Sequence, residues 1–154
     1  MDCGANLLMH VASTCPAEKV ETILELNPNV NAQDNIGRTA LHYACRAGKL
    51  DTFRVLSDLE AVEVDAVTKA GVTPLMMAIE SGNIELVAEA LNANLNPFLT
   101  DALGRKAIDY ASQFRNVKGH DMRQLITTAM TQWESQTTRE EQMQGQLEYS
   151  QAHF

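Results

Sequence analysis

The sequence predicts an all-α protein built as a solenoid of stacked helix-turn-helix pairs, and three observations lead to this prediction. Gly37, Gly71 and Gly104 are separated by 34 and 33 residues, so the chain repeats at a nearly constant period. A similar polar-to-apolar string of residues follows each of these glycines. Apolar residues then recur at helical spacing, most clearly from Met122 to Trp133. A period of this length is typical of repeat proteins, in which each unit buries its apolar face against its neighbours.

Length and composition limit the number of domains, the class of partner and the location that we expect for the protein. A chain of 154 residues fits one domain. The formal net charge of -8 argues against a nucleic-acid partner, because binding to phosphates requires clustered Lys and Arg. The start of the chain lacks a basic, apolar signal, and no stretch approaches the roughly 18 consecutive apolar residues of a membrane-spanning helix. We therefore expect no membrane insertion and a location in the cytoplasm or the nucleus.

The first unit, residues 1–33, is expected to be an N-terminal cap of the stack. Its first helix is predicted over Leu7 to Ala12 and its second over Lys19 to Leu24. Both helices are less regular than those that follow. Terminal repeats are atypical because one of their faces meets water.

The second and third units, residues 34–67 and 68–100, have the clearest helix signals. Thr39 and Thr73 stand where a hydroxyl can cap a helix, and proline follows Thr73 at the first helical position. Gly48 and Gly82 end these first helices, and amphipathic second helices follow.

The fourth unit, residues 101–130, departs from the others after Ala111. The segment 112–120 is about four residues longer than its counterpart, so we expect an extended loop that contains His120 and a second helix that restarts near Asp121. The remaining residues, 131–154, are rich in Gln, Glu and Thr. This C-terminal extension is predicted to be either helical or disordered.

Three segments carry a resemblance to a known family. Gly37 to Ala44, Gly71 to Ala78 and Gly104 to Ala111 are similar to the ankyrin motif Gly-x-Thr-Pro-Leu-His-x-Ala. The resemblance covers about residues 4 to 130, with the first and last repeats degenerate. It implies an ankyrin-repeat solenoid with β-hairpin-like loops between the helix pairs and a non-catalytic role in protein binding.

We predict no catalytic, cofactor-binding or metal-binding residues. The resemblance implies that His42, and His10 in the first unit, bond to backbone groups and lock neighbouring repeats together. His120 and His153 are expected to be exposed. Cys3, Cys15 and Cys45 form neither an even disulfide set nor a metal-ligand spacing, so they are expected to be free thiols. The chain is therefore predicted not to be an enzyme.

Partner binding is expected on the concave face, which is formed by the hairpin tips and the inner side of the first helices. The resemblance places these residues on that face, by position in the repeat: Asn35, Ile36, Arg38, Arg46, Lys69, Ala70, Val72, Glu80, Ser81, Leu103, Arg105 and Gln113. Ile36, Val72 and Leu103 at exposed tips are either anchors for a partner or structural residues, since the resemblance implies that neighbouring hairpins pack on one another. The four cations among these residues would make the face basic, which favours a protein partner with an acidic surface.

Two further sites each have two interpretations. Trp133 either caps the open end of the stack or contacts a partner, and Met143, Leu147 and Phe154 would continue such a contact along the extension. Asn31 is either a turn residue that bonds its own backbone or, as the resemblance implies, a hydroxylation substrate. The functional prediction is a small regulatory adaptor or inhibitor that acts through the concave face. The alternative is a permanent subunit of a larger assembly docked through residues 131–154, so we expect a monomer or a hetero-complex subunit.

Overall fold

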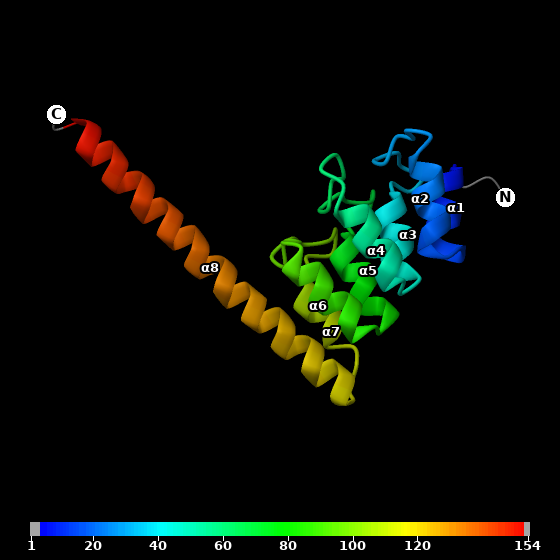
Figure 1. The fold of residues 1–154 in the computed structure, drawn as a ribbon. Helices are drawn as coiled ribbons and strands as arrows, with labels where there is room; N and C mark the ends of the chain where they lie inside the picture. The colour runs from blue at the N-terminus through cyan, green and yellow to red at the C-terminus, as the bar shows by residue number, and fades with distance from the viewer. Residues whose placement is uncertain (1–3, 153–154) are drawn as a thin grey trace.

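The computed structural model describes residues 4–152, which contain eight helices and no strand. This confirms the prediction of an all-α stack of helix pairs (Figure 1). In chain order the helices are α1 (Leu7–Thr14), α2 (Ala17–Leu24), α3 (Ala40–Arg46), α4 (Leu50–Ser57), α5 (Pro74–Ser81), α6 (Ile84–Asn92), α7 (Ala107–Ala111) and α8 (Val117–Ala152).

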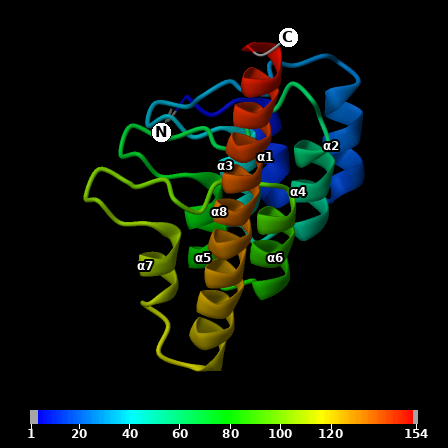
Figure 2. The same cartoon turned by 90° about the vertical axis from the view of Figure 1, so that its left-hand side faces the viewer.

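The helices form two layers. The first helices of the pairs, α1, α3, α5 and α7, contact one another in sequence, and so do the second helices, α2, α4, α6 and α8. Figure 2 shows the loops between the pairs projecting to one side, where α7 also lies. Each unit therefore rests mainly on its immediate neighbours, as expected of a solenoid.

Polar side chains cap the first helices and set where they begin. Asn6, Thr39 and Thr73 each accept a hydrogen bond from the backbone N–H three residues later. This satisfies one of the amides that a helix start leaves without an intrahelical partner. The first helices in units one to three thus begin at one position of the motif.

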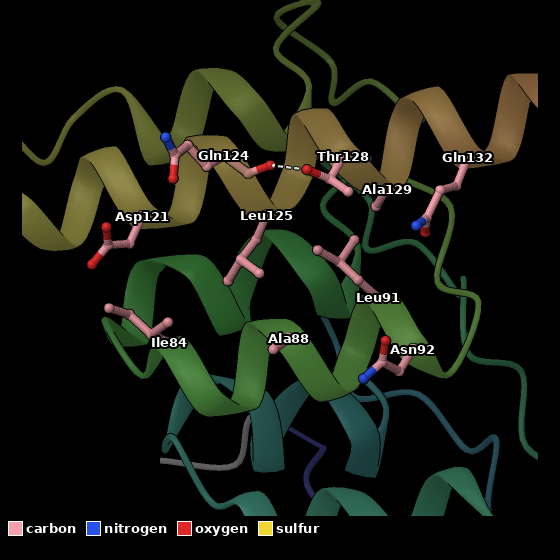
Figure 3. A pocket seen from close by; sticks show the side chains of 10 residues that line it. All are labelled: Ile84, Ala88, Leu91, Asn92, Asp121, Gln124, Leu125, Thr128, Ala129 and Gln132. Carbon is pink, nitrogen blue, oxygen red and sulfur yellow. Dashed lines mark hydrogen bonds between the residues drawn. The ribbon is translucent and has the colours of Figure 1, made fainter.

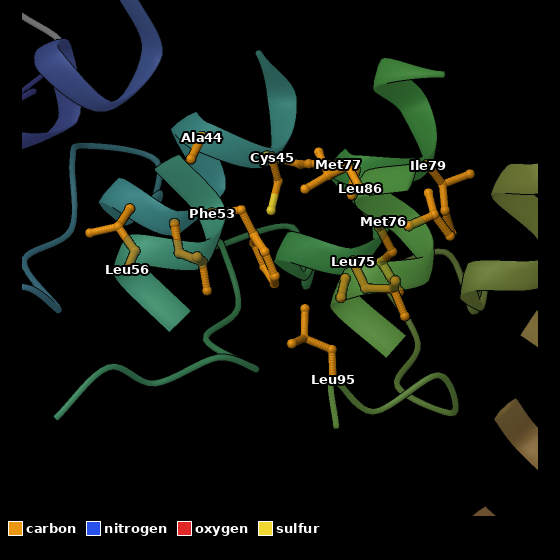
Figure 4. Packing of buried hydrophobic residues seen from close by; sticks show 14 of the residues in the cluster. Ala44, Cys45, Phe53, Leu56, Leu75, Met76, Met77, Ile79, Leu86 and Leu95 are labelled. Carbon is orange, nitrogen blue, oxygen red and sulfur yellow. The ribbon is translucent and has the colours of Figure 1, made fainter. Parts of the chain in front are cut away.

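The core follows the interface between the two layers (Figure 4). Leu41, Phe53, Leu75 and Leu86 are at most 2% exposed, and each contributes roughly 1.5–3 kcal/mol by leaving water. The small residues at the ends of the motif, Ala44, Ala78 and Ala111, are fully buried. Because they carry only a methyl group, adjacent first helices can approach closely.

The start of α8 differs from the prediction. The helix begins at Val117, four residues before Asp121, so the loop from α7 comprises residues 112–116. His120 was expected in a loop, but it lies in the first turn of α8, where it is exposed. The earlier start is possible because Gly119 is buried against the Phe114 carbonyl, in space that a Cβ would overlap.

The extension continues α8 as a helix. It passes without a break through residues 130 and 131, where we predict the boundary of the repeat domain, and runs away from the stack (Figure 1). Every residue from Glu134 to Ala152 is exposed. Over residues 4–152, none of the helices has the length and apolarity needed to cross a membrane.

Candidate functional site

Three hairpins, at residues 34–38, 68–72 and 101–105, precede the first helices and form the outer part of the concave face. In each, the backbone N–H of the first residue donates to the carbonyl of the last: Asp34 to Arg38 at 2.9 Å, Thr68 to Val72 at 3.0 Å and Asp101 to Arg105 at 3.0 Å. The hairpins also bond to one another. Lys69 N–H donates to the Ile36 carbonyl at 2.9 Å, which joins the first two hairpins into one continuous edge.

A glycine makes this close approach possible. Gly37 has a φ of 89°, in the left-handed region that favours glycine. A Cβ there would lie 3.0 Å from the backbone nitrogen of Lys69 and from the Cα of Thr68. Gly71 repeats the arrangement against Asp101 and Ala102. At Gly37 and Gly71 the glycine therefore allows backbone contact between neighbouring hairpins, whereas at Gly104, in the last hairpin, only the positive φ of 78° favours glycine.

Sequence reasoning missed the carboxylate at the base of two hairpins. Asp34 is 6% exposed and accepts hydrogen bonds from Ile36 N–H, Arg38 N–H, Arg38 Nε and the Tyr43 hydroxyl. Burial opposes the charged form, but the hydrogen bond from Tyr43 and those from Arg38 outweigh it and lower the pKa of Asp34 to about 2. The Arg38 guanidinium also lies over the Tyr43 ring, 4.8 Å from its centre.

The fourth unit contains the same cluster. The Tyr110 hydroxyl donates to Asp101 at 2.6 Å, and Arg105 Nε donates to it at 2.8 Å. These bonds lower the pKa of Asp101 to about 2, whereas burial and the adjacent carboxylate raise the pKa of Tyr110 to about 12. A shared pattern could have revealed both clusters, because Asp-x-x-Gly-Arg followed five residues later by Tyr occurs in units two and four.

The third unit replaces this cluster with neutral side chains. Thr68 stands in the place of the aspartate, and its hydroxyl accepts from Val72 N–H at 3.1 Å. Val72 and Met77 stand where the other units have arginine and tyrosine. Among the residues that the structure describes, the third unit thus has no ion pair at the base of its hairpin, whereas the second and fourth units do.

The ion pairs correct the expected charge of this face. Arg38 and Arg105 were expected to present free positive charge, but both are bound to buried carboxylates, at 2.7 and 2.8 Å. Arg46 and Lys69 are exposed, and neither forms an ion pair within residues 4–152. The excess positive charge is therefore smaller than predicted and lies on these two residues.

The candidate apolar anchors differ in exposure. Ile36 is 49% exposed and Leu103 is 77% exposed, as expected for hairpin tips. Val72 was expected at an exposed tip but is half-buried and packs against the core, because it ends its hairpin next to α5. The other proposed contact residues, Asn35, Ala70, Glu80, Ser81 and Gln113, are exposed.

Of the two histidines that were expected to join neighbouring repeats, His42 does so and His10 does not. His42 joins neighbouring units, since its Nδ1 contacts Thr39 and its Nε2 lies 2.9 Å from the Val72 carbonyl. His10 does not share this role. It is exposed, and Met9 occupies the corresponding position because α1 begins after Asn6.

Asn31 bonds to the next unit rather than to its own turn. Its side-chain amide donates to the Ala61 carbonyl at 2.6 Å, and its oxygen accepts from Glu63 N–H at 2.9 Å. Asp65 repeats this link one unit later by accepting from Asn96 N–H at 2.9 Å. Asn31 therefore connects successive loops; hydroxylation at this position stays a prediction.

The second-helix side of the stack has a groove between α6 and α8 (Figure 3). It has a volume of about 640 Å³, and Ile84, Ala88 and Leu91 face Leu125 and Ala129 across it. No group of three His, Cys, Asp or Glu side chains within residues 4–152 is arranged to hold a metal ion. The groove therefore has the character of a packing surface between helices.

The predicted contact residues of the extension lie along the exposed part of α8. Trp133 is half-buried, whereas Met143 and Leu147 are 63% and 56% exposed. Trp133 lines a cleft of about 250 Å³ together with Asn94, Gln136, Thr137 and Glu140. Phe154 lies outside the described residues, as do Cys3 and His153.

Known proteins share much of this sequence. A family model described as ankyrin repeats (3 copies) matches residues 1–66. An ankyrin repeat-containing protein of Schizosaccharomyces pombe is 33% identical over 112 residues, which cover 70% of this chain and 48% of the relative. Neurogenic locus notch homolog protein 1 is 32% identical in Xenopus laevis and 30% identical in Homo sapiens, over 114 residues that cover 74% of this chain and 4% of each relative. The chain thus spans about half the length of the yeast relative and a small part of the Notch proteins.

Proposed function

The chain belongs to the ankyrin-repeat family, and we propose that it is a non-catalytic module that binds a protein partner on its concave face. In this proposal it acts as a small regulatory adaptor or inhibitor in the cytoplasm or the nucleus. The repeats of this family generally serve protein–protein interaction.

The observation that carries the proposal is the exposure of large apolar side chains on a rigid edge. Leu103 is 77% exposed and Ile36 is 49% exposed at hairpin tips whose backbone is held by regular hydrogen bonds. Exposed leucine and isoleucine gain most by burial in a partner. Because the tips are already ordered, little conformational entropy is lost on binding.

The exposed positive charge of the concave face favours a partner with an acidic surface. Arg46 and Lys69 project exposed positive charge from α3 and from the second hairpin. A partner segment with carboxylates near apolar side chains would match both features of the face. We therefore propose an acidic protein surface that contacts Arg46 and Lys69 rather than the ion-paired Arg38 and Arg105.

Affinity capture with matched variants tests the proposal. Ile36→Ser with Leu103→Ser should abolish recovery of the partner from extracts of cells that express the protein, while Tyr149→Ser on α8 should leave recovery unchanged. Tyr149 is a suitable control because it is 67% exposed and lies close to the C-terminal end of α8, and that end of the helix projects away from the stack (Figure 1). Undiminished recovery by the double variant, with its unfolding transition intact, would refute concave-face binding.

The exposed part of α8 supports a second candidate function. Every residue from Glu134 to Ala152 is exposed, and the helix continues over them for about 30 Å at 1.5 Å per residue (Figure 1). A helix in that position presents a long surface to another subunit. We propose as the alternative that the protein is a permanent subunit of a larger assembly, docked through this helix.

A further inference from the structure

One stripe of α8 is shared by the packed and the projecting parts of the helix. Met122 and Ile126 are fully buried against the stack, and Met130 packs against the same core. Trp133 follows three residues after Met130, and Met143 and Leu147 return to the same side of the helix after further turns. The stripe therefore continues the interface with α6 and α7 past the end of α6.

A cleft lined by an aromatic ring and a carboxylate lies where the stripe leaves the stack. Trp133 and Glu140 both line the cleft of about 250 Å³, with Asn94 from the loop after α6 on its other side. An aromatic ring beside a carboxylate is a favourable setting for a Lys or Arg side chain. The cation contacts the ring face while its charge pairs with the carboxylate.

The projecting helix has little stability of its own. The hydroxyls in its first turns donate to the carbonyl four residues earlier, an arrangement that does not favour helix: Thr131, Ser135, Thr137 and Thr138. Threonine also has a modest helix propensity. Packing against another element is the usual source of stability for such a helix.

Charge distinguishes the possible occupants of the stripe. Residues 131–152 contain four acidic side chains and one arginine, and Glu140 lies within the stripe. A second copy of this chain would add the same negative charge to the contact. A helix with Lys or Arg beside its apolar residues would neutralise it.

Building on the alternative of docking through the extension, we propose that the stripe binds a basic amphipathic helix of a partner protein. A Lys or Arg of that helix enters the cleft between Trp133 and Glu140. Its apolar face covers Met143 and Leu147. The partner helix then lies against α8 beyond the end of α6, as a continuation of the second-helix layer.

Synthetic peptides provide a direct probe. We would use a peptide of about three heptads with leucine at positions a and d and lysine at e and g, and a matched peptide with glutamate in place of lysine. Trp133 is the single tryptophan of the chain, so its fluorescence reports on the cleft. The lysine peptide should bind saturably and change this fluorescence, and the glutamate peptide should not.

Variants of the full chain locate the contact. Leu147→Gln should weaken binding of the lysine peptide by about tenfold or more, because a buried leucine contributes this much. Glu140→Gln should weaken it by about threefold and reduce its dependence on salt. Tyr149→Gln, on the opposite side of the helix, should have no effect.

Three results would overturn the inference. They are equal binding of both peptides, unchanged binding after Leu147→Gln, and self-association of the chain that Leu147→Gln abolishes, which would make a second copy the occupant. Arg46→Glu with Lys69→Glu should leave peptide binding intact. Failure of this inference is therefore distinguishable from failure of the concave-face proposal.

Discussion

The hydroxyl of Tyr43 donates a 2.6 Å hydrogen bond to Oδ2 of Asp34, nine residues earlier in the chain. This bond fixes the first helix of unit two to the base of the hairpin that precedes it. Because Arg38 binds the same carboxylate oxygen, the hairpin tip and the helix form one rigid body. Tyr110 and Asp101 repeat the relationship in unit four.

Removal of the Tyr43 hydroxyl should measure how much this hydrogen bond contributes to the free energy of unfolding. Tyr43→Phe keeps the ring beneath Arg38 but removes a donor to a buried carboxylate. We expect a loss of about 1.5–3 kcal/mol in the free energy of unfolding, as is usual for a hydrogen bond to a charged group. Urea denaturation checks this, with Tyr149→Phe on exposed α8 as the control. Equal stability of Tyr43→Phe and the wild type would contradict the role assigned to the bond.

Acid should weaken the stack through the two aspartates. Asp34 and Asp101 have pKa values lowered from 3.8 to about 2 in the folded chain. The stabilisation that they provide is present above pH about 4 and is lost as pH falls toward about 2. Asp34→Asn should be less stable than the wild type at neutral pH and should lose less stability over this interval. Parallel stability curves for the two proteins would contradict this assignment.

His42 should produce a second dependence on pH, in a higher range. Burial lowers the pKa of His42 below its ordinary value of 6.5, so protonation opposes folding. The contribution of neutral His42 to the free energy of unfolding should be fully present above pH about 6.5 and should decline as pH falls below this value. In His42→Met, which copies Met76 of unit three, this decline should disappear. The variant should also lose about 1 kcal/mol at neutral pH, since the contact with the Val72 carbonyl is removed. Urea denaturation of both proteins between pH 5 and 8 checks this, and a decline unchanged in His42→Met would contradict it.

The two glycines of α8 should respond in opposite ways to alanine. A Cβ on Gly119 would overlap the Phe114 carbonyl, whereas a Cβ on Gly145 would have no described atom within 4 Å apart from its adjacent residues and the backbone of its own helix. Gly119→Ala should destabilise the chain by about 1–3 kcal/mol by overpacking. Gly145→Ala should instead favour the projecting helix by about 1 kcal/mol. Thermal unfolding measured by circular dichroism separates the two effects, and equal behaviour would show that α8 does not begin as described.

The regular part of the fold was predictable from sequence because its signals are local. The glycine period, the capping threonines and the alanines at the helix ends each report a contact that recurs from unit to unit. The start of α8 was missed because two residues outside the repeat motif set it: Asn116 caps the helix by accepting from Gly119 N–H at 3.2 Å, and Gly119 leaves room for the Phe114 carbonyl.

The charge of the concave face was predicted less well. Arg38 and Arg105 were assigned from their positions alone, without the aspartates four residues before them. The spacing from Asp34 to Arg38 and on to Tyr43 carries the information, but only folding brings the three side chains together. The state of residues 131–152 could not be decided from sequence, because Met143 and Leu147 are too few to define a helix face.

The most direct test of concave-face binding is the affinity of the recovered partner for a charge-reversed chain. We predict that Arg46→Glu with Lys69→Glu weakens binding by more than tenfold, a loss of about 1.4 kcal/mol, and leaves the unfolding transition nearly unchanged. Both residues are exposed and form no ion pair within residues 4–152, so their replacement should not disturb the fold. An equal loss of affinity on reversing Glu134 and Glu141 of α8, or no loss with the double variant, would contradict the account.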